Sequence, residues 1–412
     1  MKRLFNLNSS VPQSFTYLLP AAILLVILPL NHFMALRLTM LFLAAGAATI
    51  YVLREPISPF PLKLPLALWI GVALLSLFRS VDPWFSLNEF KTEIGYGMIA
   101  FLTFFSITRT HKVFDRWVNV LLIGLAITFI FAMVEKWYDH LHPMDWHWLH
   151  GVGTYSTYLV TIFPFLIFAL LRQQSSWSRF LVILMLPLFL LVGFISLNTT
   201  FWIAAMVMSL VFFTFWRYQK SGAFGVTKFL LAFLLIFVVG SASLLTFIKY
   251  KYAPNQPVPI ENVVLRQAKA DDRLDIWRFW LERLKERPLT GVGFGRDAPH
   301  YAYLSQIPSD RNPVSYAHAH NLFIDYGLQM GIPGIMALLF LIASISREFW
   351  KFFRSSNEEL RLIGICGITL VVGVLTKNMT DDFFWRGNSL LFWTLVGISL
   401  GYGKNKLREI SQ

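Results

Sequence analysis

The sequence predicts an all-α protein that crosses a membrane many times. Of its 412 residues, 56% are hydrophobic, 16% are aromatic and only 14% are charged. An ordinary soluble domain is about 45–50% apolar and about 25% charged, so this composition suits lipid as the main solvent. Apolar runs of about 20 residues, the length that a helix needs to cross a bilayer, recur along the chain. The same composition excludes a disordered chain, a collagen-like fibre and a disulfide scaffold.

About twelve such runs are predicted, and no clear cleavage site of small residues follows the first, so we expect a first helix there rather than a removed signal. The chain then divides into residues 1–248 with helices 1–9, a large loop over residues 249–321, and residues 322–412 with helices 10–12. The runs begin near Phe15, Leu36, Leu64, Gly95, Val118, Val152, Phe180, Phe201, Phe229, Leu322, Leu362 and Ser389.

The basic residues predict the orientation. If the N-terminus is inside, alternate loops hold over half of the positive charge, and the short loops on the other side hold very little. The positive-inside rule then places both termini in the cytoplasm and residues 249–321 on the outer face, because long loops translocate regardless of charge. The net charge of +13 therefore reflects topology rather than a nucleic-acid partner. The basic loop residues are Lys2, Arg3, Arg54, Lys63, Arg109, Lys112, Arg116, Arg172, Arg179, Arg217, Lys220, Lys228, Arg347, Lys351, Arg354, Arg361, Lys404, Lys406 and Arg408.

The large loop contains a candidate amphipathic helix over residues 272–287. Leu274, Trp277, Leu281 and Leu284 recur at helical spacing with charged residues between them. Such a helix would lie at the membrane surface or cap the bundle. The glycine-rich sequence PLTGVGFG of residues 288–295 ends it.

Polar residues gather on the outer side of the predicted membrane. An arginine fork binds phosphate oxygens in pairs, and a histidine near neutral pKa can take a proton from a hydroxyl. Together they suggest a lipid-diphosphate donor and a hydroxyl acceptor that meet at headgroup depth. We find no nucleotide-binding motif. The residues are His318, His320 and Asn321 where the chain re-enters the membrane, Arg79 and Lys91, the loop group Lys377, Asp381, Asp382 and Arg386, and the loop group Asp139, His140, His142, Asp145, His147 and His150.

Structural interpretations compete for some of these groups. The spacing of the four loop histidines fits no standard zinc site, and nearby Trp and Tyr residues favour an interfacial aromatic belt. Arg283, Lys285 and Arg287 are expected on a solvated face. Cys366 is the one cysteine, so it excludes an internal disulfide, and it is expected to act as a small hydrophobe. We therefore predict no metal and no cofactor.

One combination of motifs resembles a known family. His320 and Asn321, nine residues, then Gly331 and Gly334 resemble the H-N-x9-G-x-x-G signature of the bacterial O-antigen ligase/polymerase superfamily, at the expected junction of large loop and helix. Upstream, Arg273 to Trp277 and residues 288–295 are similar to the family's R-x3-W…P-x2-G-x-G-x-G stretch. The resemblance extends to residues 151–154, to residues 86–91, and to Asp381 before Trp385.

The resemblance implies an inverting glycosyltransferase of the GT-C type that needs no metal. An O-antigen ligase of this family transfers polysaccharide from undecaprenyl diphosphate to lipid A–core at the periplasmic face of the inner membrane. By position, His320 matches the general base and Arg273 the arginine that holds the diphosphate, with Lys91 near that donor site. His318, Asn321, Asp381, Gly331 and Gly334 would support them.

One position departs from the family pattern. The resemblance leads us to expect a second diphosphate-binding arginine in an N-R-x2-W sequence, but Thr199 stands there. Loss of a charged hydrogen bond to phosphate costs roughly 1.5–3 kcal/mol. Either another arginine substitutes in space, or the donor is held differently, or the chain is a weakened variant. The candidate substitutes are Arg386, Arg296, Arg266 and Arg79.

Three alternatives to the ligase stay open. An O-antigen polymerase would use a lipid-linked repeat as acceptor, and the H-N-x9-G-x-x-G motif favours the ligase over it. A protein O-oligosaccharyltransferase usually carries an added C-terminal periplasmic region, whereas this sequence ends at Gln412. A flippase would place polar groups near the bilayer midplane, often on repeated halves. We find no internal repeat, and the polar groups lie on one face.

Overall fold

The computed structural model describes residues 15–30, 32–54, 58–141, 151–172, 176–195, 198–219, 235, 238–242, 273–309, 311, 313–380, 382 and 384–411. Over these residues the chain is helical and contains no strand, as the sequence predicts.

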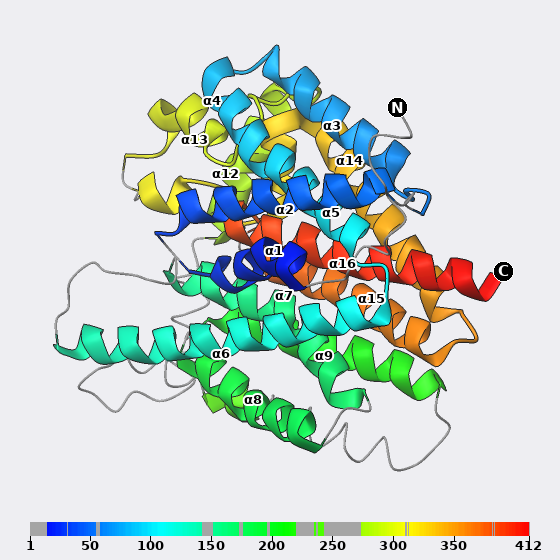
Figure 1. Ribbon diagram of the computed structural model, residues 1–412. Coiled ribbons are helices and arrows are strands. Elements are labelled where there is room, and N and C mark those ends of the chain that lie inside the picture. Colours follow the sequence, from blue (N-terminus) through cyan, green and yellow to red (C-terminus); the bar gives the residue numbers. More distant parts are fainter. Residues whose placement is uncertain are drawn as a thin grey trace.

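The first half of the chain forms long, mostly apolar helices (Figure 1). They are α1 (Phe15–Ile27), α2 (Met34–Arg54), α3 (Lys63–Leu77), α4 (Pro83–Glu89), the π-helical turn η1 (Phe90–Gly95), α5 (Tyr96–Ile107), α6 (His111–Leu141), α7 (Gly151–Leu171), α8 (Ser176–Ile195) and α9 (Thr199–Gln219).

The second half combines short loop helices with three long ones. They are α12 (Arg273–Glu286), α13 (Ala298–Tyr303), η2 (Leu304–Gln306), η3 (Pro313–Tyr316), α14 (Leu322–Phe353), α15 (Glu358–Asn378) and α16 (Arg386–Ser411). The short helices α12 and α13 lie beside α4 on one side of the bundle (Figure 1).

Six helices of the described chain are long and apolar enough to cross a membrane, namely α2, α6, α7, α9, α14 and α15. Every predicted apolar run that falls on described residues coincides with a helix. The run predicted from Phe229 is described only at residues 235 and 238–242, which are helical. The chain is therefore an all-α polytopic membrane protein, and the count of twelve spans stays a prediction.

Close helix packing in the core depends on small residues. A Cβ atom at Gly397 of α16 would lie 2.6 Å from the carbonyl oxygen of Phe101 on α5, and one at Gly401 would lie 2.5 Å from that of Phe105. The two backbones therefore approach as closely as only glycine permits, which is the usual way for helices to associate in lipid. Trp393 lies one turn before Gly397 on α16, and its ring centroid is 5.6 Å from that of Trp69 on α3.

Residues from the predicted cytoplasmic loops meet at one end of the bundle. Arg172, after α7, forms ion pairs with Asp115 of α6 and Glu359 of α15. The hydroxyl of Tyr402 on α16 donates to the same Glu359 at 2.8 Å. These contacts place the starts of α6 and α15 and the ends of α7 and α16 at one level. The alternation of the predicted topology requires this arrangement, and the membrane side itself stays a prediction.

The amphipathic helix predicted at residues 272–287 is present as α12. Its buried face matches the predicted one in part, because Trp277 and Leu284 pack on the core but Leu274 and Leu281 do not. Ile276 and Trp280 are 3% and 0% exposed, whereas Leu274 and Leu281 are 68% and 43% exposed. Apolar residues occur around most of this helix, so their spacing alone did not select the contact face. The choice comes from tertiary packing, because α12 lies against α14 and the residues just before it.

Candidate active site

The start of α14 is fixed by the side chain of Asn321. Its Oδ1 accepts hydrogen bonds from the amides of Phe323 and Ile324, at 3.0 and 3.2 Å. Asparagine is among the favoured residues for this N-cap position because it satisfies amides that have no partner within the helix. Its Nδ2 donates to the carbonyl oxygen of Met379 at 2.8 Å. Asn321 therefore ties the first turn of α14 to the end of α15.

His320 immediately precedes this cap in a strained conformation. Its φ is +52°, a region that residues other than glycine seldom adopt. Its ring Nε2 lies 3.2 Å from the carbonyl oxygen of Ser315. A carbonyl can only accept, so Nε2 carries the hydrogen and the neutral ring has its lone pair on Nδ1. The half-buried His320 can therefore take up a proton at Nδ1.

His318 packs against His320, with 3.9 Å between the ring centroids. Its Nδ1 accepts a hydrogen bond from the backbone amide of His320 at 3.1 Å, and its Nε2 lies against the guanidinium of Arg296. The side chain of His318 is buried. His318 is thus placed to hold the loop in which His320 is strained.

A buried acid that the sequence analysis missed lies behind these histidines. Asp325, in the first turn of α14, is fully buried. Its Oδ1 accepts from the amide of Ala319 at 2.7 Å, and its Oδ2 lies 3.8 Å from Nδ1 of His318. The sequence signal was available, because an acid inside a predicted span is a candidate functional residue by default.

Two arginines flank a single indole beside the histidine pair. The guanidinium carbons of Arg296 and Arg386 lie 4.7 and 4.0 Å from the ring centroid of Trp385. Both are within the range of cation–π attraction. Arg386 has a φ of +46°, and its backbone amide donates to both carboxylate oxygens of Glu93 at 2.8 Å. The helix that precedes α5 therefore holds Arg386 in place.

Burial raises the pKa of the nearby carboxyl groups, and it leaves Glu93 and Asp382 partly protonated near neutral pH. Burial raises the pKa of Glu93 to about 8 and also raises the pKa of Glu89. Burial, and then the proximity of Asp325, raise the pKa of Asp382 to about 7. Partly protonated acids cancel less of the charge on Arg296 and Arg386. The cluster therefore stays attractive to an anion.

The glycine-rich loop of residues 288–295 clasps a break in α14. The amides of Val292 and Gly293 donate to the carbonyl oxygens of Leu328 and Gln329, at 2.9 and 3.0 Å. From beyond the break, the amide of Ile332 donates to the carbonyl oxygen of Pro288 at 2.7 Å. The glycine-rich loop and the G-x-x-G motif of α14 are thus joined by backbone hydrogen bonds. Arg296, which follows the loop, lies next to His318.

Gly331 makes the break in α14 possible. Its φ is +72°, and a Cβ atom there would lie 2.5 Å from the backbone of Leu289. At Gly334, one turn later, a Cβ atom would lie 2.5 Å from Cβ of Met330. Both glycines of the G-x-x-G motif therefore allow close approach. Neither takes part in chemistry.

The structure gathers some of the predicted site residues and places others apart. His318, His320, Asn321, Arg296 and Arg386 come together. Lys91 is exposed, and its ammonium group donates to Oδ1 of Asn88 at 2.8 Å.

Arg273 begins α12 and is half-buried. Ile276 and Trp280 follow it on the same helix by about one and two turns. These two side chains pack in one cluster with Tyr316 and Ala319. Arg79 is exposed in the turn after α3. Arg266, Asp381 and residues 142–150 of the histidine-rich loop lie outside the described residues. Among those that are described, no group of three or more His, Cys, Asp or Glu residues is placed to hold a metal ion.

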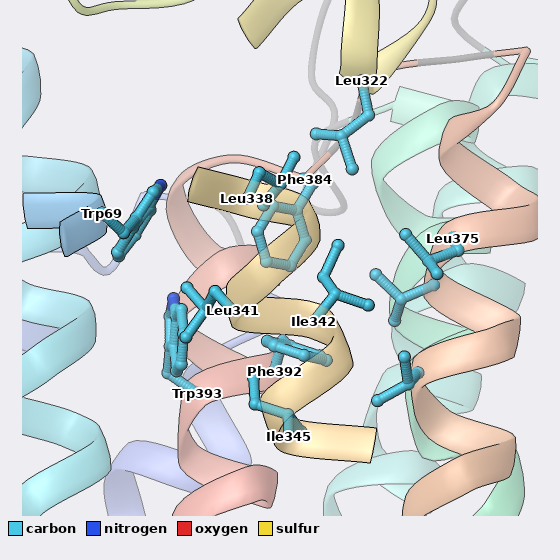
Figure 2. Close-up of a pocket in the computed structure, with 12 residues that line it drawn as sticks. Trp69, Leu322, Leu338, Leu341, Ile342, Ile345, Leu375, Phe384, Phe392 and Trp393 are labelled. Carbon is cyan, nitrogen blue, oxygen red and sulfur yellow. The ribbon is translucent and has the colours of Figure 1, made fainter. Parts of the chain in front are cut away.

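A small apolar pocket of about 20 Å³ lies next to the cluster. Figure 2 shows its side chains turned toward a common space between α14 and the helices around it. Leu322 follows Asn321 directly, and Phe384 precedes Trp385, so the pocket adjoins the polar cluster. It is lined by Trp69, Leu322, Leu338, Leu341, Ile342, Ile345, Val371, Val374, Leu375, Phe384, Phe392 and Trp393.

Comparison with known proteins supports the resemblance seen in the sequence. Residues 188–339 match the model of a family described as O-antigen ligase, a stretch that includes His320, Gly331 and Gly334. The chain is also 21% identical over 173 residues to an uncharacterized protein of Haemophilus influenzae, which covers 40% of this chain and 43% of the relative. The chain therefore matches less than half the length of that relative. The family match confirms the resemblance.

Proposed function

Taking the chain as a member of the O-antigen ligase/polymerase superfamily, we propose that it is an O-antigen ligase. It would transfer polysaccharide from undecaprenyl diphosphate to a sugar hydroxyl of lipid A–core, at the periplasmic face of the bacterial inner membrane. The observation that carries this proposal is the juxtaposition of His320 with two arginines on Trp385 at the mouth of an apolar pocket. This juxtaposition supports a candidate base, a candidate anion site and an apolar surface for lipid in one place.

The two arginines are suited to the donor diphosphate. Their planar forks pair with phosphate oxygens, and their stacking on Trp385 orients them before the ligand arrives. We propose that Arg296 and Arg386 supply the contact that the family obtains from an arginine where this chain has Thr199. Arg273 and Lys91 would act at the edge of the same site.

The reaction needs one proton acceptor and a stabilised leaving group. His320 Nδ1 takes the proton of the acceptor hydroxyl, and the hydroxyl oxygen attacks the anomeric carbon opposite the diphosphate. The bond from that carbon to the diphosphate oxygen breaks, and undecaprenyl diphosphate leaves with the electron pair. The configuration is inverted, and the arginines hold the charge that develops. Such GT-C-type chemistry requires no metal or cofactor.

The apolar pocket gives the donor lipid a place beside the cluster. A polyprenyl chain gains roughly 0.8 kcal/mol for each methylene-sized group that it buries. Leu322 and Phe384 lie where the polar cluster passes into the pocket. The pocket itself has room for about one water. The proposal therefore places the first isoprene units against the apolar side chains at this end of it and leaves the rest of the chain in the membrane.

A lipopolysaccharide gel from cells that lack this gene tests the assigned activity, together with an assay for polymer on the undecaprenyl carrier. A ligase predicts bare core with long polymer stranded on the carrier. Core that carries a single repeat would instead identify a polymerase. Normal lipopolysaccharide with an unglycosylated protein substrate would identify an oligosaccharyltransferase.

The role of His320 is tested with purified protein and a lipid-linked donor. A general base contributes typically 10²–10⁴-fold, so His320→Ala should lower kcat by about that factor. His111→Ala is the control, because that histidine lies exposed at the opposite end of the bundle. Full transfer by His320→Ala would exclude the general-base assignment.

A further inference from the structure

Asp325 and Asp382 form a buried acid pair that the proposed reaction does not use. Asp325 is 0% exposed and Asp382 is 3% exposed. They come from different elements, one from the first turn of α14 and the other from the turn between α15 and α16. Burying two ionised carboxylates side by side is costly, so their protonation state matters for every group around them.

The charged groups around this pair come from every element packed against it. Arg296 and His318 come from the loop before α14. Arg296 interacts electrostatically with both acids, and His318 lies 3.8 Å from Asp325 and interacts with Asp382. His320 faces Asp325. Glu93 of η1 faces Asp382 and is bound in turn to Arg386 of α16. The pair therefore has the cation Arg296 on the histidine side and a largely protonated acid on the other.

The hydrogen bonds of Asp325 indicate that a proton is shared. Its Oδ1 accepts from the amide of Ala319. Its Oδ2 is buried, and among the described residues no N–H group and no hydroxyl donates to it. Asp382 lies within hydrogen-bonding reach of Asp325. A proton on Asp382 provides the missing donor, in agreement with the raised pKa of that group.

We propose that Asp325 and Asp382 share one proton and together hold one negative charge, which stabilises the positive charge that His320 gains as a base. Asp325 Oδ2 lies 3.8 Å from His318 Nδ1, and the His318 ring lies 3.9 Å from that of His320. The carboxyl pair thus acts through His318 as a positioning and charge-balancing unit. That His320 takes a proton from an acceptor hydroxyl rests on the proposed function. The single negative charge of the acid pair does not.

A shared proton makes a distinctive prediction for variants. In Asp325→Asn the remaining Asp382 ionises, and in Asp382→Asn the remaining Asp325 does, so each single variant keeps one negative charge. Only the double variant loses it. An opposite charge nearby favours the protonated form of a histidine. Protonation of His320 should therefore change little in either single variant and become less favourable in the double variant.

The titration of His320 can be measured without any transfer assay. Diethyl pyrocarbonate modifies unprotonated imidazole, and mass spectrometry of the full-length protein reports the rate at His320 against pH. Glu282→Gln is the matched control, because it removes an exposed acid that is paired with Lys285 on α12. The proposal expects a lower midpoint in the double variant alone. Equal shifts in a single variant and the double, or no shift in the double, would overturn it.

A second measurement covers the case in which the double variant fails to fold. The infrared spectrum of the wild-type protein should show a protonated carboxyl band at pH 7 that moves when aspartate is labelled with ¹³C, which separates it from Glu93. Each single variant should lose that band. Its absence from the wild-type protein would refute the shared proton. If the chain proves to catalyse no transfer, the titration and the band still decide the charge of the pair.

Discussion

The guanidinium carbon of Arg296 lies 4.7 Å from the centre of the Trp385 ring, while the guanidinium of the same side chain contacts Nε2 of His318. One arginine thereby joins the glycine-rich loop, the turn before α16 and the histidine pair. Its position depends on three elements that are far apart in the sequence.

Replacement of Arg296 by lysine should impair donor binding although the charge is kept. An ammonium cannot contact the indole face, His318 and two phosphate oxygens as a planar fork does. A lost charged hydrogen bond is worth roughly 1.5–3 kcal/mol, so the donor KM of Arg296→Lys should rise about tenfold or more. Arg278→Lys, on the exposed face of α12, is the control. An unchanged KM would separate Arg296 from the donor.

Gly293→Ala should disrupt the site. The φ of Gly293 is +116°, and an added Cβ atom would lie 2.2 Å from Oγ of Ser80. We expect a lower yield of folded protein and a lower unfolding temperature in detergent. Gly46→Ala on α2 is the matched control, because a Cβ atom there has no neighbour within 4 Å, and alanine in a helix stabilises by about 1 kcal/mol. If both variants unfold at the wild-type temperature, the loop does not need its glycine.

Stability should fall as pH rises through the neutral range. Burial raises the pKa of Glu93 from its ordinary 4.5 to about 8. Between these values the folded protein holds a proton that the unfolded chain has lost, so each rise in pH favours unfolding. The unfolding temperature in detergent should be a few degrees higher at pH 5.5 than at pH 8. Glu93→Gln should weaken that dependence, and an identical slope in this variant would show that Glu93 does not cause it.

Filling the apolar pocket should affect long donors selectively. Ile342→Trp puts a larger side chain into the pocket of Figure 2. Transfer from an undecaprenyl-linked donor should fall several-fold, with less effect on a donor that carries a short prenyl chain. Leu339→Trp is the control, since Leu339 is on the same helix but 43% exposed. An equal loss with both donors would mean that the pocket does not hold the lipid.

The sequence predicted the start of α14 and its histidines well, because both are local features. Asn321 caps the helix from its own first turn, and His318 and His320 sit beside it in the chain. The amphipathic pattern of α12 was also predictable as a helix. Its contact face was not, because Leu274 and Ile276 are equally apolar and only the packing on α14 distinguishes them.

The residues that the sequence did not predict are those defined by distant partners. Asp325 is a single acid in an apolar run until Asp382 and His318 are placed around it. Glu93 gains its role only from the amide of Arg386. Trp385 entered the analysis as part of a motif, but its contact with two arginines requires the large loop and α16 to meet. The sequence shows which side chains can do chemistry, but it does not show which distant side chains the fold brings together. The second limit is the greater one for predicting this site.

The bond between Glu93 and Arg386 also has a consequence for biosynthesis. It joins residues 293 positions apart, and helices are made and inserted from the N-terminus onward. Most of the chain must leave the ribosome before Arg386 can reach Glu93 and take its place beside Trp385. The nascent protein therefore spends nearly its whole synthesis without the complete arginine pair on Trp385, and the membrane domain must be almost finished before the proposed donor site exists.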